Sequence, residues 1–104
     1  MESTTVVQYV IAERRLLARL KGGDIRAIKL QIGLPEPLEG RWVAKIAVDG
    51  LYPNVVSVPG VDSFQALNLA FGVVRTALEK FLGTGGQLFW EDASGPLGVD
   101  DILS

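Results

Sequence analysis

The sequence contains no cysteine and no histidine among its 104 residues. Without cysteine the chain can form no disulfide, offers no thiolate nucleophile and cannot bind a metal through sulfur. Without histidine it lacks the side chain that most often acts as a general base or a metal ligand. We therefore expect a protein that is not an enzyme, with no metal site and no cofactor.

Long apolar runs and an excess of basic residues are also missing. No stretch has the apolar length of a membrane span, and the first four residues do not begin a signal peptide, so we expect a cytoplasmic protein. The formal net charge is −2 and the pI is about 5.0. An acidic chain of this kind disfavours a nucleic-acid-binding surface.

The length and the apolar content predict one domain with a real core. Hydrophobic residues make up 48% of the chain. A chain of this size buries roughly two thirds of the surface that it exposes when unfolded. We assign residues 1–92 to a single α+β domain and residues 93–104 to a flexible acidic C-terminal tail. Four apolar residues of that tail could dock on the domain, and these are Leu97, Val99, Ile102 and Leu103.

The clearest element is one long amphipathic helix within residues 60–83. Asp62 or Ser63 can cap its start, and Gln65 stands three residues after Asp62, which is a variant of the capping box. Gly83 is placed for a left-handed C-cap. Apolar residues cover about half of the circumference, which predicts a helix lying on a core surface. Only Leu69 breaks the division into an apolar and a polar half.

Alternating apolar and polar residues predict strands at residues 25–33, 41–49 and 55–58 before the helix, and at 87–90 after it. In the strand at 41–49, the side chains expected to face out are Arg41, Val43, Lys45, Ala47 and Asp49. Residues 5–20 are ambiguous. Their β-branched first half favours a strand, although the spacing of Val6, Val10, Leu17 and Leu20 also fits a helix. We favour the strand.

Residues 33–40 are expected to form a loop, because Pro35 and Pro37 cannot donate to a strand ladder and restrict the residues before them. The resulting order is β-β-β-β-α-β. Short connections imply an antiparallel meander of about four strands. The helix should pack on one face of that sheet. The opposite face, with Lys29, Gln31 and Lys45, would be solvated or would form an interface.

Four short motifs carry a family resemblance. They are Ala12-Glu13-Arg14-Arg15-Leu16, Ile32-Gly33-Leu34-Pro35, Gly60-Val61-Asp62-Ser63-Phe64-Gln65-Ala66-Leu67 and Leu88-Phe89-Trp90. Together they resemble a family of small bacterial proteins of unknown function over most of residues 6–92. The resemblance implies a bacterial cytoplasmic protein and no assigned activity.

The layout of residues 60–82 also resembles antitoxins of the HicB type, which place a short meander before a glycine-containing turn and an alanine-rich helix. The acidic pair usual near that helix start is replaced here by Gln65-Ala66. No DNA-binding helix-turn-helix follows residue 92.

Two further groups of residues could act in binding. Arg14, Arg15 and Arg19 form the densest basic group; on a strand, Arg15 and Arg19 share one side and Arg14 points to the other. They could meet an anionic partner or simply form an outward polar face. Trp42 and Trp90 fall in strand patterns and are expected in the core, with a partner hot spot as the alternative.

The candidate partner-binding surface is a polar stripe on the helix. Arg75 and Glu79 are four residues apart and can pair. Gly72 costs about 1 kcal/mol relative to alanine in an exposed helix, so it indicates either a close approach by a partner or by the tail, or mere tolerance. The stripe consists of Gln65, Asn68, Gly72, Arg75 and Glu79.

From these observations we predict a non-catalytic domain that binds another protein or a second copy of itself. An antitoxin or immunity-type binder is one version of this prediction. The alternative is a small-ligand-binding protein or a carboxylate-dependent enzyme. A deep pocket with converging polar groups and a lid at residues 34–40 would favour that alternative. A flat exposed apolar or aromatic patch would favour the protein binder.

Overall fold

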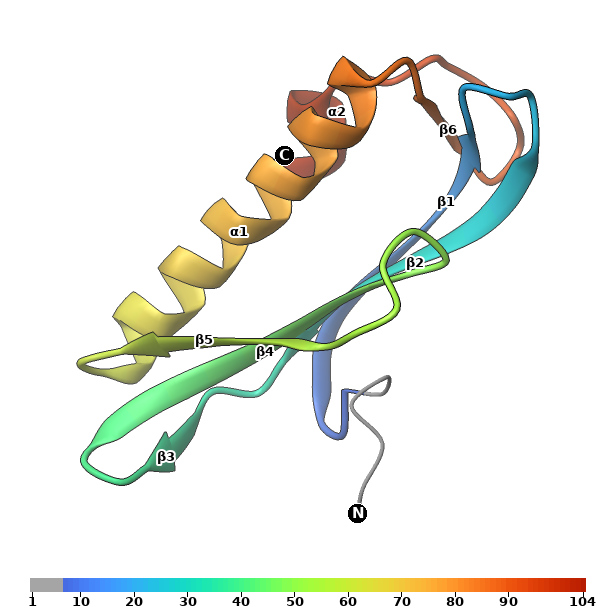
Figure 1. Cartoon of the computed structure of the whole chain (residues 1–104). Coiled ribbons are helices and arrows are strands. Elements are labelled where there is room, and N and C mark those ends of the chain that lie inside the picture. Colours follow the sequence, from blue (N-terminus) through green and yellow to red (C-terminus); the bar gives the residue numbers. More distant parts are fainter. Residues whose placement is uncertain (1–6) are drawn as a thin grey trace.

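A computed structural model describes residues 7–104, so Thr5 and Val6 of the predicted first strand lie outside the described residues. It shows the α+β fold class expected from the sequence, with one long helix over one face of a curved antiparallel sheet (Figure 1). The elements are β1 (Val10–Arg19), β2 (Ile25–Gly33), β3 (Glu36–Leu38), β4 (Arg41–Asp49), β5 (Val56–Gly60), α1 (Ser63–Gly83), β6 (Gln87–Trp90) and α2 (Val99–Leu103).

The ambiguous first segment is a strand. β1 pairs with β2 in an antiparallel register that runs from Ala12 opposite Ile32 to Arg19 opposite Ile25. On its other side β1 pairs with β6. The strand prediction is therefore confirmed for residues 10–19, and the tertiary pairing decides what the local pattern left open.

The sheet has β5 at one edge. Trp42 of β4 pairs with both β3 and β5, and Ile46 pairs with both β2 and β5. Because a residue has one neighbour on each side, β5 must lie on the edge of β4 that is opposite to β2 and β3. At the far edge, the Leu97 amide donates to the Leu88 carbonyl at 2.7 Å, so the chain after β6 covers that side.

The predicted loop at residues 33–40 is wrong for residues 36–38, which form the short strand β3. Glu39 and Gly40 both have positive φ, at 49° and 81°. Two successive positive values are typical of a two-residue type I′ hairpin turn, which places Leu38 opposite Arg41. Pro37 is tolerated because a short edge strand is one of the places where proline occurs in sheets.

The start of α1 follows the prediction closely. Asp62 is the N-cap, and its Oδ1 accepts a hydrogen bond from the Gln65 amide at 2.8 Å. The Gln65 Oε1 in turn accepts from the Val61 amide at 2.8 Å, one residue before the cap. This reciprocal pair satisfies two amides and fixes where the helix begins.

The predicted C-cap at Gly83 is wrong. The helix includes Gly83, and the left-handed residue is Gly85 with φ of 99°. The Gly85 amide donates to the Leu82 carbonyl and the Gly86 amide to the Phe81 carbonyl, both at 3.2 Å. These two bonds form a Schellman motif, in which the run of glycines is an ordered helix end and not a flexible connection.

The core lies between α1 and the sheet. One row of the helix, at every fourth residue, is fully buried: Ala66, Ala70, Val74 and Leu78. Trp42 and Trp90 are partly buried and pack against this core, as expected. Val43 and Ala47, expected to face out, are also buried, as is Val7. A Cβ at Gly33 would lie 2.8 Å from Val7 Cγ1, so the segment before β1 packs on this part of the outer face.

The end of the chain joins the core. α2 contributes two buried side chains, Val99 and Ile102. The Arg14 Nη1 donates to the Ile102 carbonyl at 2.9 Å, and its guanidinium lies 5.3 Å from the centre of the Trp90 ring. Residues 97–103 therefore belong to the domain, and the boundary that we placed at residue 92 does not separate a tail from it.

Neither helix in the described part of the chain is both long enough and apolar enough to cross a membrane.

Candidate functional site

The predicted polar stripe does not act as one unit on α1. Gln65 is engaged in the helix cap. Arg75 pairs with Asp100 of α2 at 3.0 Å, and not with Glu79 as we expected from their spacing. Asn68 and Glu79 are exposed. Of the stripe residues, Gln65 thus belongs to the helix cap, Arg75 to a contact with α2, and Asn68 and Glu79 to the exposed surface.

Gly72 has a separate environment. A Cβ added there would meet no atom within 4 Å in the described part of the chain. The close approach that we considered as its reason, by a partner or by the tail, is therefore not made by residues 7–104. Gly72 instead lies on the wall of a groove.

This α1–β5 groove has a volume of about 890 Å³. It runs between α1 on one side and β5 with the preceding turn on the other. Its floor is apolar and comes from Ile46 and Val48 of β4 and Val58 of β5. At one end β5 meets the first turn of α1 so closely that a Cβ on Gly60 would overlap the backbone of Ala66.

The two ends of the groove differ in polarity. At the end nearer to the start of α1, Leu69 faces Val58 and Pro59, and Leu69 keeps 48% of its surface exposed. At the other end lie Thr76 and Lys80 of the helix. The turn before β5 is joined to that end of α1, because the Tyr52 hydroxyl donates to the Ala77 carbonyl at 3.2 Å.

The edge of β5 beside the groove is poorly suited to adding another strand. Pro59 lies opposite Val43 in the β4–β5 register. Proline has no N–H, and in an edge strand its nitrogen faces away from the paired neighbour. The free edge therefore lacks a donor at the fourth of the five residues of β5, which helps to protect it from strand addition.

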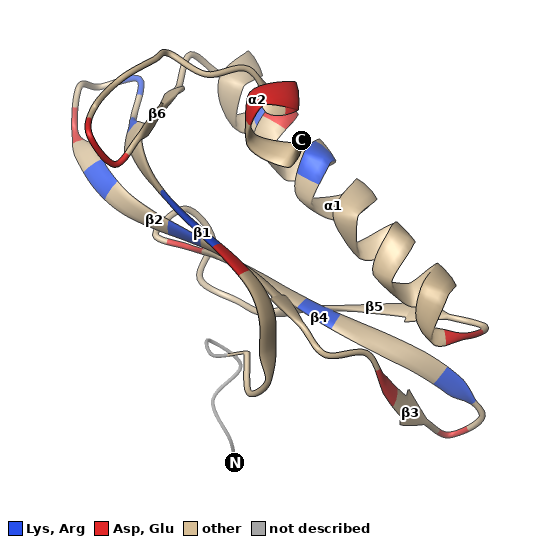
Figure 2. Ribbon diagram, turned by 180° about the vertical axis from the view of Figure 1, so that it is seen from behind, with Lys and Arg blue, Asp and Glu red and all other residues tan. Residues whose placement is uncertain are grey.

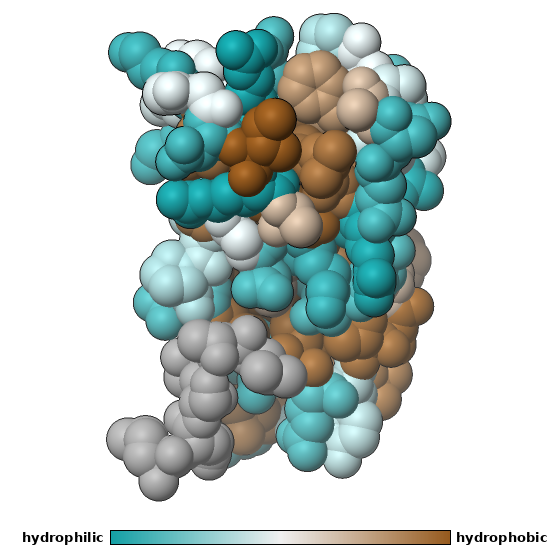
Figure 3. Space-filling model, turned by 90° about the vertical axis from the view of Figure 1, so that its right-hand side faces the viewer, coloured by the Kyte–Doolittle hydropathy of each residue, from teal (hydrophilic) through white to brown (hydrophobic). Residues whose placement is uncertain are grey.

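A second exposed apolar surface lies on the face of the sheet opposite to α1. Leu17 of β1 is flanked by Ala27 of β2 and by Phe89 of β6. The next pair on the same face of these two strands is Ile25 opposite Arg19, and Ile25 keeps 68% of its surface exposed. We call Leu17, Ile25, Ala27 and Phe89 the outer patch. Figure 3 shows apolar side chains in the upper part of this face, surrounded by hydrophilic ones.

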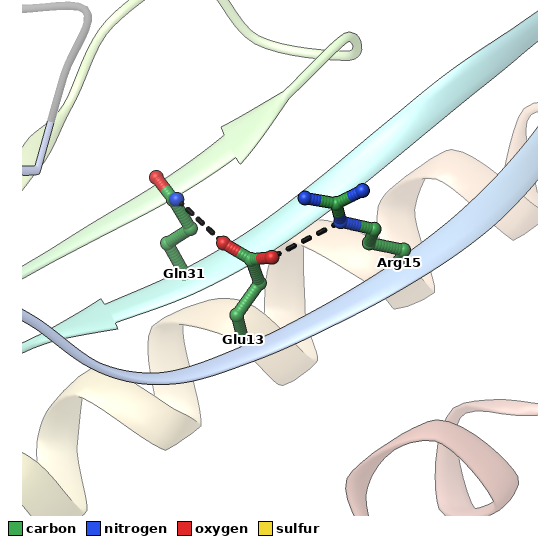
Figure 4. A network of polar contacts seen from close by, with 3 residues as sticks. All are labelled: Glu13, Arg15 and Gln31. Carbon is green, nitrogen blue, oxygen red and sulfur yellow. Dashed lines mark hydrogen bonds and ion pairs between the residues drawn. The ribbon is translucent and has the colours of Figure 1, made fainter.

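A charged network lies beside the outer patch. The Glu13 carboxylate accepts from Gln31 Nε2 at 2.9 Å and from Arg15 Nε at 3.1 Å, as Figure 4 shows. These hydrogen bonds, the one from Gln31 foremost, lower the pKa of Glu13. Arg15 stands directly opposite Lys29, an unfavourable like-charge pair. Glu13 and Asp49, which lies opposite Lys29 on β4, bracket the two cations.

Figure 2 shows the result on the ribbon, where charged segments follow one another along β1 and β2 while most of α1 carries no charge. The basic group is divided, as the strand geometry predicted. Arg14 turns inward to Trp90 and α2, whereas Arg15 and Arg19 lie on the outer face. The three arginines thus do not form a single anion-binding surface.

In the described residues 7–104, no group of three or more Asp or Glu side chains is close enough to hold a metal ion. Asp92 accepts hydrogen bonds from the amide and hydroxyl of Ser94, and these lower the pKa of Asp92. This is a turn contact between two exposed residues.

Sequence reasoning did not predict the groove or the outer patch. The signal for the groove was Leu69, the one apolar residue on the polar half of the helix, which the structure places on the groove wall. The outer patch had a weaker signal. Leu17 interrupts an otherwise polar row, but its proximity to Phe89 depends on the β1–β6 pairing, which no local pattern reveals.

Comparison with known proteins finds a family. A family model described as a domain of unknown function (DUF6968) matches residues 12–100. No curated protein and no solved structure matches the chain.

Proposed function

The chain belongs to the DUF6968 family, whose function is unknown, and we propose that this domain is a non-catalytic module that binds another protein through the outer patch. Membership in a family of unknown function is what the sequence motifs led us to expect. The observation that supports the proposal is the outer patch, in which Ile25 and Ala27 are exposed and Leu17 and Phe89 are half-buried.

The layering of the fold makes this patch unusual. α1 and α2 cover one face of the sheet, whereas the outer patch on the other face is covered only in part: a Cβ on Gly95 would lie 3.1 Å from Phe89 Cδ2, while Ile25 keeps 68% of its surface exposed. Contiguous exposed apolar surface on a folded domain indicates an interaction site. Burying a side chain such as Ile25 or Phe89 contributes about 1.5–3 kcal/mol each, which is enough for a few residues to anchor a partner.

The surroundings of the patch suit an interface. Its residues lie on three paired strands, so the surface is held rigidly before any partner arrives. Arg15, Arg19 and Lys29 border it together with the carboxylates of Asp49 and Glu91, so the rim is polar and carries both charges. Protein interfaces combine an apolar centre with a polar rim of this kind. Such a rim favours a partner that places complementary charges of both signs around an apolar centre.

The carboxylates support the non-catalytic part of the proposal. General acid–base catalysis needs a group whose pKa lies near the working pH. The pKa values of Glu13 and Asp92 both move down, away from neutral pH. Residues 34–40, which we considered as a lid, form the β3 hairpin and contribute no residue to the α1–β5 groove in the described structure.

The proposal also includes a cytoplasmic location, which fractionation of the native cells with an antibody to the protein would test. Binding and neutralising a toxin is one version of the proposed function. A toxin and any other protein partner would bind at the same apolar surface.

The test is an affinity capture from the native cell extract with three tagged proteins: wild type, Ile25→Glu and Phe64→Glu. Phe64 is the matched control, because it is an apolar side chain with 77% exposure that lies on α1, outside the outer patch. We expect one stoichiometric protein, identified by mass spectrometry, with wild type and Phe64→Glu but not with Ile25→Glu.

A partner that binds all three proteins equally would contradict the proposed surface. Capture of no protein, with a small molecule retained instead, would contradict the protein-binding function. Light scattering on the same proteins distinguishes self-association, since a dimer through the patch would be lost in Ile25→Glu only.

A further inference from the structure

The α1–β5 groove has a chemistry different from that of the outer patch. We propose that it binds a free aliphatic chain that ends in a carboxylate. This site does not rest on the protein-binding proposal, because the two surfaces lie on opposite faces of the sheet and share no residue.

The size and lining of the groove fit a small amphiphile. Its volume of about 890 Å³ falls within the range of about 300–1,000 Å³ that is typical of small-molecule sites. Such sites have mainly apolar walls and a few polar groups that fix the orientation of the ligand. Here the walls are aliphatic over most of the length, and the polar side chains gather near Tyr52, Thr76 and Lys80.

The length of the groove also fits. Leu69 and Lys80 mark its two ends on the helix, and eleven residues of α-helix span about 16 Å. An extended decanoate or dodecanoate chain is of comparable length. Its methyl end would lie near Leu69 and its carboxylate near Lys80.

The charge that lines the groove determines which charge the polar end of the ligand should carry. Among residues 7–104, Lys80 is the one charged residue that lines it, and no acidic side chain does. Within residues 7–104 the ion pairs are Arg15 with Glu13 and Arg75 with Asp100, so Lys80 has no carboxylate partner there.

The partial negative charge at the C-terminal end of α1 does not cancel this preference for a carboxylate. A helix C-terminus carries a partial negative charge of about half an elementary charge, smaller than the full charge of a lysine. Its last carbonyls already accept hydrogen bonds from the amides of Thr84, Gly85 and Gly86. The nearest strong charge to a ligand at this end is therefore the Lys80 ammonium.

An alkyl chain fits the walls better than an extended peptide does. A peptide lying between α1 and β5 would place its N–H and C=O groups against aliphatic side chains, and such groups lose free energy when they leave water without a new partner. The β5 edge offers one partner fewer than a regular strand, because Pro59 has no N–H. An alkyl chain has no such groups to satisfy.

The test uses the full chain, isotope-labelled for NMR, with decanoate as the probe and decanol and decyltrimethylammonium as matched neutral and cationic analogues. We expect saturable binding of one decanoate, with shifts of the groove amides and not of the outer patch. Gly72→Leu fills the wall of the groove and should weaken decanoate at least tenfold, whereas Asn68→Leu, on the exposed side of α1, should not.

The carboxylate is tested at Lys80. Lys80→Gln should weaken decanoate about fivefold, as expected for one exposed ion pair, and leave decanol unchanged. Lys80→Arg should restore decanoate binding. Circular dichroism and thermal unfolding confirm that each variant is folded.

Each contrary result would overturn one part of the proposal, either the location of the site or the recognition of the carboxylate. If decanoate shifts no groove amide, or binds Gly72→Leu as well as wild type, the groove is not the site. If decyltrimethylammonium binds as tightly as decanoate, or if Lys80→Gln changes nothing, the carboxylate is not recognised. None of these results depends on a protein partner, so the outer patch is judged separately by the capture experiment.

Discussion

The ring of Phe81 lies directly against Gly86, so closely that a Cβ on Gly86 would overlap three atoms of the ring. The same two residues are joined along the backbone, because the Gly86 amide donates to the Phe81 carbonyl at 3.2 Å. This contact lies at the C-terminal end of α1, immediately before the chain enters β6. It explains why glycine is required at this position although its φ is not in the left-handed region.

Gly86→Ala should therefore destabilise the fold. The added methyl group must displace the Phe81 ring from the core, and overpacking of this kind typically costs about 1–3 kcal/mol. The measurement is the free energy of unfolding in urea. Gly83→Ala is the control, since Gly83 lies inside the helix with no atom within 4 Å of the added Cβ. Equal stability of the two variants would contradict the role given to the ring.

Gly72→Ala should stabilise the protein. Gly72 is an exposed helical residue with open space at the Cβ position. Alanine is better than glycine in an exposed helix by about 0.8–1 kcal/mol. Thermal and urea unfolding would measure the gain. A loss of stability would show that something outside the described residues approaches Gly72 in the folded protein.

The helix α1 shows which features could be predicted from the sequence and which could not. Asp62, Gln65 and the buried row of α1 were predictable because a cap and an amphipathic pattern are local properties. The stop was misplaced by two residues, since a left-handed conformation was equally available to Gly83 and Gly85 and only packing chose between them. Such choices among neighbouring glycines depend on contacts that lie outside the segment.

The sheet shows the other limit. Alternation predicted β2 and β4, yet it assigned Val43 and Ala47 to solvent, because it cannot tell that a second segment packs on the outer face. The Arg75–Asp100 pair was missed for a similar reason. Its partner stood in a stretch whose composition resembled a tail, and tertiary contacts replaced the local pairing that we expected with Glu79.

The network around Glu13 predicts a pH-dependent contribution to stability. Hydrogen bonds from Gln31 and then Arg15 lower the pKa of Glu13 in the folded state below its ordinary value of 4.5. A lowered folded-state pKa means that the contribution is fully present above about 4.5 and is lost as the pH falls through the folded-state pKa. Glu13→Gln should therefore be less stable than wild type at pH 7.

The difference between the two proteins should shrink as the pH falls through the folded-state pKa of Glu13, because wild-type Glu13 is then itself protonated. Urea unfolding at a series of pH values measures it. Glu36→Gln, an exposed carboxylate on β3 outside the network, is the control. A gap between Glu13→Gln and wild type that stays constant with pH would show that the network adds nothing through its charge.

Arg14 is expected to hold α2 on the domain. Its guanidinium donates to the Ile102 carbonyl at 2.9 Å and lies over the Trp90 ring, so it joins β1, β6 and α2. Arg14→Ala removes a charge-assisted hydrogen bond and a cation–π contact. From typical values for the two interactions we expect a loss of about 1–3 kcal/mol, carried mainly by α2.

Hydrogen exchange locates that loss. In Arg14→Ala the amides of residues 99–103 should exchange faster, while those in the middle of α1 keep their protection. Arg15→Ala is the matched control, because Arg15 lies on the opposite face of the same strand and touches Glu13 instead. Arg14→Lys should restore the protection only in part, since a lysine can supply the charge but not the planar group that stacks on Trp90. Exchange that rises equally in both helices would mean that Arg14 supports the whole core and not the docking of α2.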